Sequence, residues 1–170
     1  KEGVLEHHFL NSRGAIARFD RGAIEIRLID LQEAPVVDLA IAEFFIGILK
    51  LLCYERWSGT ATQQVLHEDE LFPILLKGIR EGHQMKVENS KYLACFGIDQ
   101  NIIDATDLWG KLLAEVEISD IAAKTIGQIL DKGTLSARIS KKLGHSANKI
   151  EIQNVYSELA QCLASNRFFI

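Results

Sequence analysis

Two short runs of alternating residues on either side of a tight turn constrain the fold of this chain most strongly. The runs lie within residues 12–32, and the turn between them is Asp20-Arg21-Gly22. In the second run, apolar residues at positions 24, 26 and 28 alternate with Glu25 and Arg27. A period of two is typical of a half-buried strand. Turn residues between two such runs therefore predict a β-hairpin over about residues 13–31.

The polar side of this hairpin has an unusual composition. Glu25 and Arg27 lie two residues apart on one strand, and Arg18 lies within reach on the preceding strand. One interpretation is a carboxylate and a guanidinium that face a cavity, where the carboxylate can bind Mg²⁺ and the guanidinium can bind a carboxylate or phosphate. The other is a cross-strand ion pair on a solvent-exposed sheet, worth less than about 1 kcal/mol. Periodicity alone leaves both open.

The remainder of the chain has helical periodicity. Pro35 is suited to the first position of a helix, and the residues from Pro35 to Trp57 are apolar nearly all round, which predicts a central buried helix that lies against the hairpin. Residues 61–91 indicate one or two helices interrupted by Pro73. The polar composition of residues 79–91 predicts a solvated loop.

The second half of the chain predicts further helices from residue 102 onward. Gly133 is a predicted C-cap, Thr134 the N-cap of a short helix that closes at Gly144, and Ser146 or Asn148 the start of the last helix. We therefore expect one α+β domain over residues 1–170, mostly helical, with a hairpin at about 13–31 packed on a helical bundle at about 35–166.

Composition and charge exclude several classes of protein. The net charge of −4 argues against a general nucleic-acid binder, and the most apolar segment is interrupted by Asp38, Glu43 and Lys50, which argues against a membrane span. Three widely spaced cysteines without a CxxC pair indicate buried, reduced thiols rather than a disulfide framework or a zinc site. We expect a cytoplasmic protein. The adjacent His7 and His8 point apart and do not predict a metal site.

The chain also has features expected of a fragment. It begins at Lys1, its one methionine is Met85, and only two strands are predicted. An isolated hairpin is marginally stable and has unpaired edges. We therefore expect a C-terminal fragment whose hairpin is the remnant of a larger sheet, with self-association through the uncovered edge as a possible consequence.

The run RGAIARFDRGAIEIRLID, residues 13–30, resembles the C-terminal catalytic strands of the glutamate–cysteine ligase and carboxylate–amine ligase superfamily. In that superfamily a strand carries Glu-x-Arg followed three residues later by a polar or acidic position, here Glu25, Arg27 and Asp30. The resemblance implies that Glu25 is a metal ligand for the magnesium nucleotide and that Arg27 contacts the substrate or the transferring phosphoryl group. By the same resemblance Arg18, and also Arg13, are candidates for binding the carboxylate of the amino-acid substrate.

The superfamily builds its active site from a curved antiparallel sheet, with further acidic metal ligands on N-terminal strands. The resemblance therefore implies that this chain supplies one wall of a site completed by the missing N-terminal part, and that it is inactive alone. The implied reaction uses ATP and Mg²⁺ to form a γ-glutamyl amide from glutamate and a small amine or thiol amino acid, as in glutathione biosynthesis. The alternative is a non-catalytic helical interaction module with a structural hairpin. The sequence specifies neither the amine acceptor nor the oligomeric state.

Overall fold

The computed structural model describes residues 14–170, and the chain divides into two compact units, residues 1–31 and residues 32–170. We call these the hairpin unit and the helical unit. Arg13, His7 and His8, which the sequence analysis singled out, lie outside the described residues.

The hairpin unit contains strands β1 (Ala15–Arg18) and β2 (Ala23–Ile26), which pair antiparallel with Ile16 opposite Glu25. The N–H of Arg27 donates to the carbonyl of Gly14 at 2.9 Å and extends the pairing by one step. The turn is a single 3-10 turn, Phe19–Arg21, that ends at Gly22 with φ +57°. This left-handed conformation favours glycine. The predicted hairpin is confirmed, although its strands are shorter than residues 13–31.

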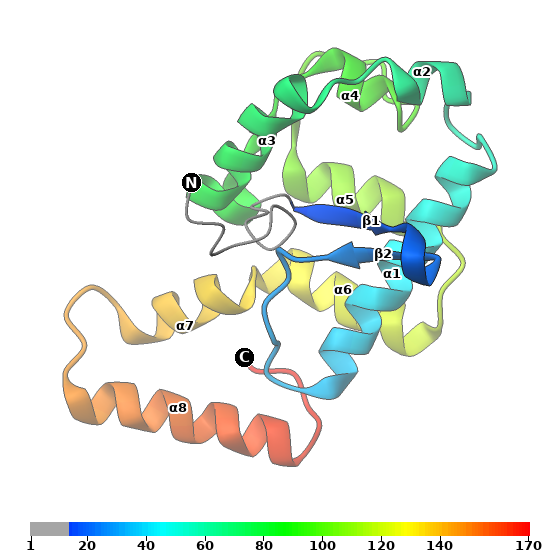
Figure 1. Cartoon of the computed structure of the whole chain (residues 1–170). Helices are drawn as coiled ribbons and strands as arrows, with labels where there is room; N and C mark the ends of the chain where they lie inside the picture. The colour runs from blue at the N-terminus through cyan, green and yellow to red at the C-terminus, as the bar shows by residue number, and fades with distance from the viewer. Residues whose placement is uncertain (1–13) are drawn as a thin grey trace, which may run out of the picture. The chain divides into compact units, whose positions relative to one another are not determined.

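Eight α-helices and two short strands form the helical unit (Figure 1). This mostly helical α+β architecture is the predicted fold class. The helices are α1 (Pro35–Cys53), α2 (Thr60–Gln64), α3 (Glu68–Glu81), α4 (Ser90–Ala94), α5 (Ala105–Leu113), α6 (Asp120–Lys132), α7 (Leu135–Leu143) and α8 (Lys149–Ala164). Strand β3 (Lys86–Val87) pairs antiparallel with β4 (Ile103–Asp104) in a second sheet that the sequence analysis missed.

Helix α1 begins and ends for local reasons. Pro35 occupies its first turn, and the Asp38 carboxylate in the same turn accepts a hydrogen bond from the N–H of Gln32 at 3.1 Å. The helix ends at Cys53, before the predicted Trp57, and Glu55 follows with φ +55°. The helix was predicted to be buried nearly all round, but only one side of α1 is buried, and Leu39 on another side is 69% exposed.

The main core of the helical unit lies where α1 packs against α6 and α5 packs beside it. Gly47 makes a close approach possible, because a Cβ atom at this position would lie 3.1 Å from the Cβ of Val116. Most of the buried side chains of this core come from α1, β3, α4, β4, α5 and α6. They include Phe44, Ile48, Val87, Leu93, Ile103, Leu108, Leu112 and Ile126.

Two predictions for residues 61–91 are wrong. Pro73 does not interrupt a helix but lies inside α3, which continues to Glu81. Residues 79–91 do not form a solvated loop: they contain the end of α3, a 3-10 turn (Gly82–Gln84) and β3. Met85 and Val87 are buried in the main core, so two apolar side chains anchor this polar segment.

The predicted helix ends in the second half of the chain are confirmed. Helix α6 ends at Gly133, and the Thr134 hydroxyl caps α7 by accepting from the N–H of Ala137. Helix α7 closes at Gly144. Of the two predicted starts for the last helix, Asn148 is the observed one, and it forms a capping box with Glu151.

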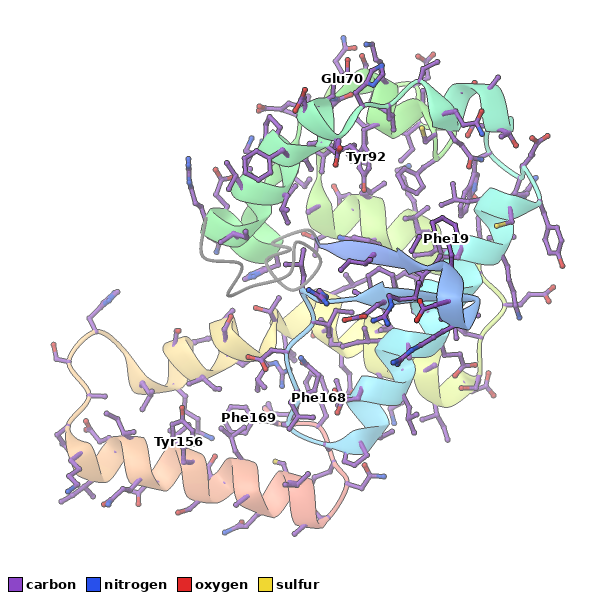
Figure 2. All side chains as sticks on the ribbon, in the orientation of Figure 1. Phe19, Glu70, Tyr92, Tyr156, Phe168 and Phe169 are labelled. Atoms are coloured by element: carbon purple, nitrogen blue, oxygen red, sulfur yellow. The ribbon has the colours of Figure 1, made fainter. Side chains whose placement is uncertain are left out.

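Helices α7 and α8 lie side by side and enclose a smaller second core around Val155, Cys162 and Phe169 (Figures 1 and 2). Its connection to α1 is a buried ion pair. The Glu33 carboxylate accepts from the Arg138 guanidinium at 2.6 Å, and the exposed fractions of the two side chains are 0% and 4%. Arg138 also donates to the carbonyls of Gly133 and Phe169, and Glu33 accepts from the N–H of Phe169.

The three cysteines are free thiols, but only two are buried. Cys95 and Cys162 lie in the interior as predicted, whereas Cys53 is exposed because it ends α1. Burial raises the pKa of the Cys95 thiol. Among residues 14–170, no helix has the length and apolar character needed to cross a membrane.

We predict that replacing Arg138 with Met lowers the free energy of unfolding by about 3–5 kcal/mol, because the Glu33 carboxylate is left buried without its partner. Urea denaturation followed by circular dichroism measures this loss. The double variant with Glu33→Leu should recover most of the stability, since neither charge then remains buried.

The surface pair of Lys142 and Glu158 provides a matched control. Replacing Glu158 with Gln should cost less than about 1 kcal/mol, because exposed ion pairs contribute little. Equal losses in the buried and the exposed variant would contradict a special role for Glu33 and Arg138.

Candidate functional site

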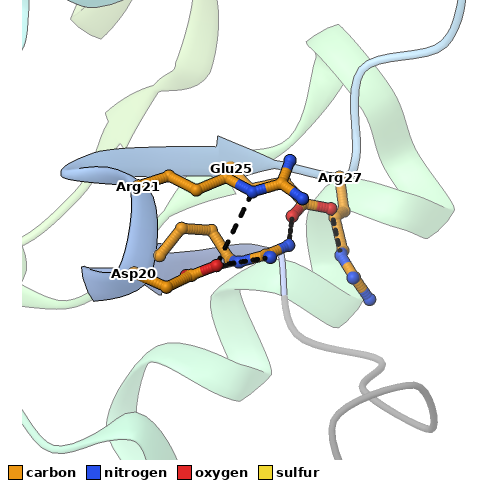
Figure 3. A network of polar contacts seen from close by, with 5 residues as sticks. Asp20, Arg21, Glu25 and Arg27 are labelled. Carbon is orange, nitrogen blue, oxygen red and sulfur yellow. Dashed lines mark hydrogen bonds and ion pairs between the residues drawn. The ribbon is translucent and has the colours of Figure 1, made fainter.

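The hairpin brings one carboxylate between two guanidinium groups. Arg18 is the last residue of β1, Glu25 lies near the end of β2, and Arg27 follows β2 directly. One Glu25 oxygen accepts from Nη1 of Arg18 at 2.9 Å, and the other accepts from Nε of Arg27 at 2.8 Å (Figure 3). We call Arg18, Glu25 and Arg27 the arginine–glutamate cluster.

The turn adds a second carboxylate to the cluster. Asp20 accepts two hydrogen bonds from Arg18, from Nε at 3.2 Å and from Nη2 at 3.1 Å. Because this contact is bidentate, it fixes the plane of the Arg18 guanidinium. Arg21 also lies near Asp20, with its Nε 3.6 Å from the carboxylate oxygen that Nη2 of Arg18 contacts (Figure 3).

Electrostatic contacts keep both carboxylates ionised. Hydrogen bonds from Arg27 and then Arg18 lower the pKa of Glu25, and the hydrogen bond from Arg18 lowers the pKa of Asp20. The hydrogen bond with Asp20, and to a smaller extent the one with Glu25, raises the pKa of Arg18. The cluster is therefore charged at neutral pH, and it is half-exposed: the exposed fraction is 30% for Arg18 and 37% for Glu25.

Three of the predicted site residues thus come together, and one residue was missed. Arg18, Glu25 and Arg27 form the cluster, whereas Arg13 lies outside the described residues. The Asp30 carboxylate accepts from the N–H of Leu31 at 2.8 Å. Asp20 was interpreted only as a turn residue. Asp20 follows Arg18 by two residues, at the start of the turn, and this spacing is the signal that could have identified Asp20 as a partner of Arg18.

The cluster can provide one ligand to a metal ion. An ionised carboxylate has about four lone-pair sites, and the two hydrogen bonds to Glu25 use two of them, so a hard cation such as Mg²⁺ can still coordinate. Within residues 14–170, however, no group of three His, Cys, Asp or Glu side chains is arranged to hold a metal ion. A complete metal site would therefore need ligands from beyond these residues.

Comparisons with known proteins give one similarity. A protein of Archaeoglobus fulgidus, described as an uncharacterized protein, is 25% identical over 167 residues, which cover 98% of this chain and 39% of that protein. The chain thus spans about two fifths of the length of this relative. No protein-family model and no solved structure matches the chain.

We predict that replacing Arg27 with Gln raises the pKa of Glu25 toward the ordinary value for glutamate, because the largest stabilising contact of the ionised form is removed. An NMR titration of the Glu25 carboxyl carbon measures this shift. Since the pKa is lowered in the folded state, ionised Glu25 stabilises the native hairpin at neutral pH. This contribution should be lost as the pH falls through the folded-state pKa.

Arg21 offers a control on the same turn. It lies near Asp20 and forms no hydrogen bond with Glu25 among the contacts of the described residues, so Arg21→Gln should leave the pKa of Glu25 unchanged. A shift of the same size in both variants would indicate a general charge effect rather than the specific contact with Arg27.

Proposed function

We propose that this chain supplies part of the active site of an ATP-dependent carboxylate–amine ligase of the glutamate–cysteine ligase type. The observation that carries the proposal is the arginine–glutamate cluster, in which Glu25 lies within hydrogen-bond distance of both Arg18 and Arg27. The positions of these residues correspond to the strand motif of the superfamily that the sequence resembles.

The proposed roles follow from the chemistry of each group. Glu25 is held ionised by its neighbours, so it can bind a cation without first losing a proton. The planar guanidinium of Arg27 matches a phosphoryl group or a carboxylate. Arg18, whose guanidinium plane is fixed by Asp20, would bind the carboxylate of an amino acid. Arg13 remains a further candidate for this last role.

A reaction of this class has two steps. The side-chain carboxylate of glutamate attacks the γ-phosphorus of ATP and ADP leaves; an amine then attacks the acyl phosphate, and phosphate leaves as the amide forms. Bound Mg²⁺ would neutralise negative charge on the transferring phosphoryl oxygens, with Glu25 as one of its ligands. Arg27 and Arg18 would stabilise the same developing charge and orient the substrates.

The other ligands and substrate contacts would come from a longer protein. The described residues of the hairpin bring two carboxylates to Arg18, those of Glu25 and Asp20, but residues 14–170 contain no group of three metal ligands. The chain corresponds to 39% of the length of the Archaeoglobus relative. Both observations are compatible with a site that other parts of the full-length protein complete.

We predict that full-length protein with Glu25→Gln loses Mg²⁺-dependent ATP binding, with affinity reduced at least about tenfold, because a neutral amide is a poor ligand for a hard cation. Isothermal titration calorimetry with Mg²⁺ and ATP, in the presence of glutamate, measures binding. Release of ADP measures turnover, which Arg27→Ala should reduce by about 10²-fold or more.

Asp20→Asn is the matched control, because it alters the same hairpin and the same Arg18 contacts while Glu25 keeps its charge. We expect its nucleotide binding to stay within a few-fold of wild type. Unchanged binding and turnover in Glu25→Gln would contradict the ligase proposal, and so would equal losses in both variants.

A non-catalytic helical interaction module is the second candidate. On α1, Leu39 and Ile46 are 69% and 53% exposed and lie seven residues apart, on one side of the helix. Exposed apolar residues at this spacing can bind a partner. The same calorimetric experiment distinguishes the two functions, because an interaction module requires neither Glu25 nor nucleotide.

A further inference from the structure

The helical unit contains an apolar cavity of about 410 Å³ between α1, α3, α5 and α6. On the α3 side, Gly78 and Gly82 leave the wall without side chains. The aromatic and branched residues that shape the other walls are Ile41, Phe45, Trp109, Ile126, Ile129 and Leu130. None of the residues that line the cavity belongs to the arginine–glutamate cluster.

A cavity of this size and composition favours an apolar occupant. Protein interiors are packed about as densely as organic crystals, so unfilled space leaves the lining side chains without contacts on one side. The cavity opens to solvent on one side, and most of the surface that water meets there is apolar, so an apolar molecule that replaces this water is favoured. A pocket of a few hundred Å³ with few polar groups is typical of a small-molecule site.

The aromatic wall indicates the shape of the occupant. Trp109 lies 6.0 Å from Phe44 with the rings at 62° and 6.1 Å from Phe45 with the rings at 54°, measured between ring centroids. A ligand ring can pack against the parts of Trp109 and Phe45 that line the cavity, in the offset or edge-to-face geometry that aromatic pairs prefer. Trp109 and Phe45 are both partly exposed and both line the cavity.

The polar part of the lining is small and comprises His83, Thr106 and Thr134. Both hydroxyls are already used within the protein: Thr106 donates to the carbonyl of His83 at 3.3 Å, and Thr134 caps α7. The imidazole of His83 forms no hydrogen bond with any of residues 14–170. It is therefore the group that can donate to, or accept from, a ligand.

We propose that this cavity binds a small, largely apolar molecule that has an aromatic ring system and one hydrogen-bonding group. The rings pack against Trp109 and Phe45, and the polar group bonds to the imidazole of His83. No residue of the arginine–glutamate cluster lines the cavity, so either proposal can fail without the other.

The first test maps the position of a two-ring probe, 2-naphthol, by NMR of isoleucine methyl groups in the whole chain. We expect saturable shifts at Ile41 of α1 and at Ile129 of α6, which line the cavity. Ile46 of α1 and Ile121 of α6 should not respond, since they lie on the same helices but are exposed and outside the cavity. Absence of shifts up to the solubility limit of the probe, or equal shifts at all four methyl groups, would overturn the proposal.

The second test fills the cavity. Ile129→Phe should weaken 2-naphthol binding at least about tenfold, because the larger ring occupies the space of the probe. Ile121→Phe makes the same substitution on the exposed side of α6 and should leave binding unchanged. Circular dichroism shows whether each variant is folded, and Leu130→Phe replaces Ile129→Phe if that variant is not. Equal affinity in the filled and control variants would count against the cavity.

The third test concerns the hydrogen bond. His83→Leu should weaken binding of 2-naphthol by about tenfold and leave binding of naphthalene, which has no hydroxyl group, unaffected. His83→Gln, which retains a donor and an acceptor, should restore part of the preference for 2-naphthol. If His83→Leu weakens both probes equally, the imidazole has only a structural role and the assignment of the polar group is wrong.

Discussion

The helical unit depends on the buried ion pair between Glu33 and Arg138. Arg138 connects the segment before α1, the residue after α6 and the segment after α8, because it donates to Glu33 and to the carbonyls of Gly133 and Phe169. Nearby, the side chain of Asn166 accepts from the N–H of Val36 at 2.9 Å and satisfies a free donor in the first turn of α1. Since a buried charge without its partner is strongly unfavourable, alternative placements of α7 and α8 on α1 are penalised.

Contacts between glutamate and arginine have opposite consequences at Glu33 and at Glu25. The Glu33 carboxylate is 0% exposed, and its hydrogen bonds are to Arg138 and to the main chain of Phe169. The Glu25 carboxylate is 37% exposed, lies between two guanidiniums and retains lone pairs that water or a cation can use. Burial thus makes one carboxylate a structural connection, while partial exposure leaves the other available for chemistry. Because Glu25 is partly exposed and Glu33 is buried, the hairpin is the candidate site and the buried pair of Glu33 and Arg138 is not.

Predictions from the sequence succeeded where the determining interaction is local. The turn and two helix starts could be derived from residue type alone, because each depends on hydrogen bonds to residues no more than three positions away. The residues that form them are Gly22, Thr134 and Asn148. The contact between Glu33 and Arg138 spans 105 residues, and no periodicity signals it. Residues 79–91 were misassigned because tertiary packing of Met85 and Val87 outweighs their polar neighbours. In the candidate site, the alternation of apolar and polar residues predicted that Glu25 and Arg27 lie on the same side of the strand. It did not predict the bidentate contact between Asp20 and Arg18.

The location of the Glu33 partners has a consequence for biosynthesis. A ribosome makes the chain from its N-terminus, so the residues of α1 and α6 can meet before α8 exists. Glu33, by contrast, accepts from an N–H that lies 136 residues later, at Phe169. Until that residue emerges, the start of α1 holds a carboxylate whose buried partners are incomplete. The contacts that tie α7 and α8 to the start of α1 therefore cannot be complete until the residues after α8 have been synthesised.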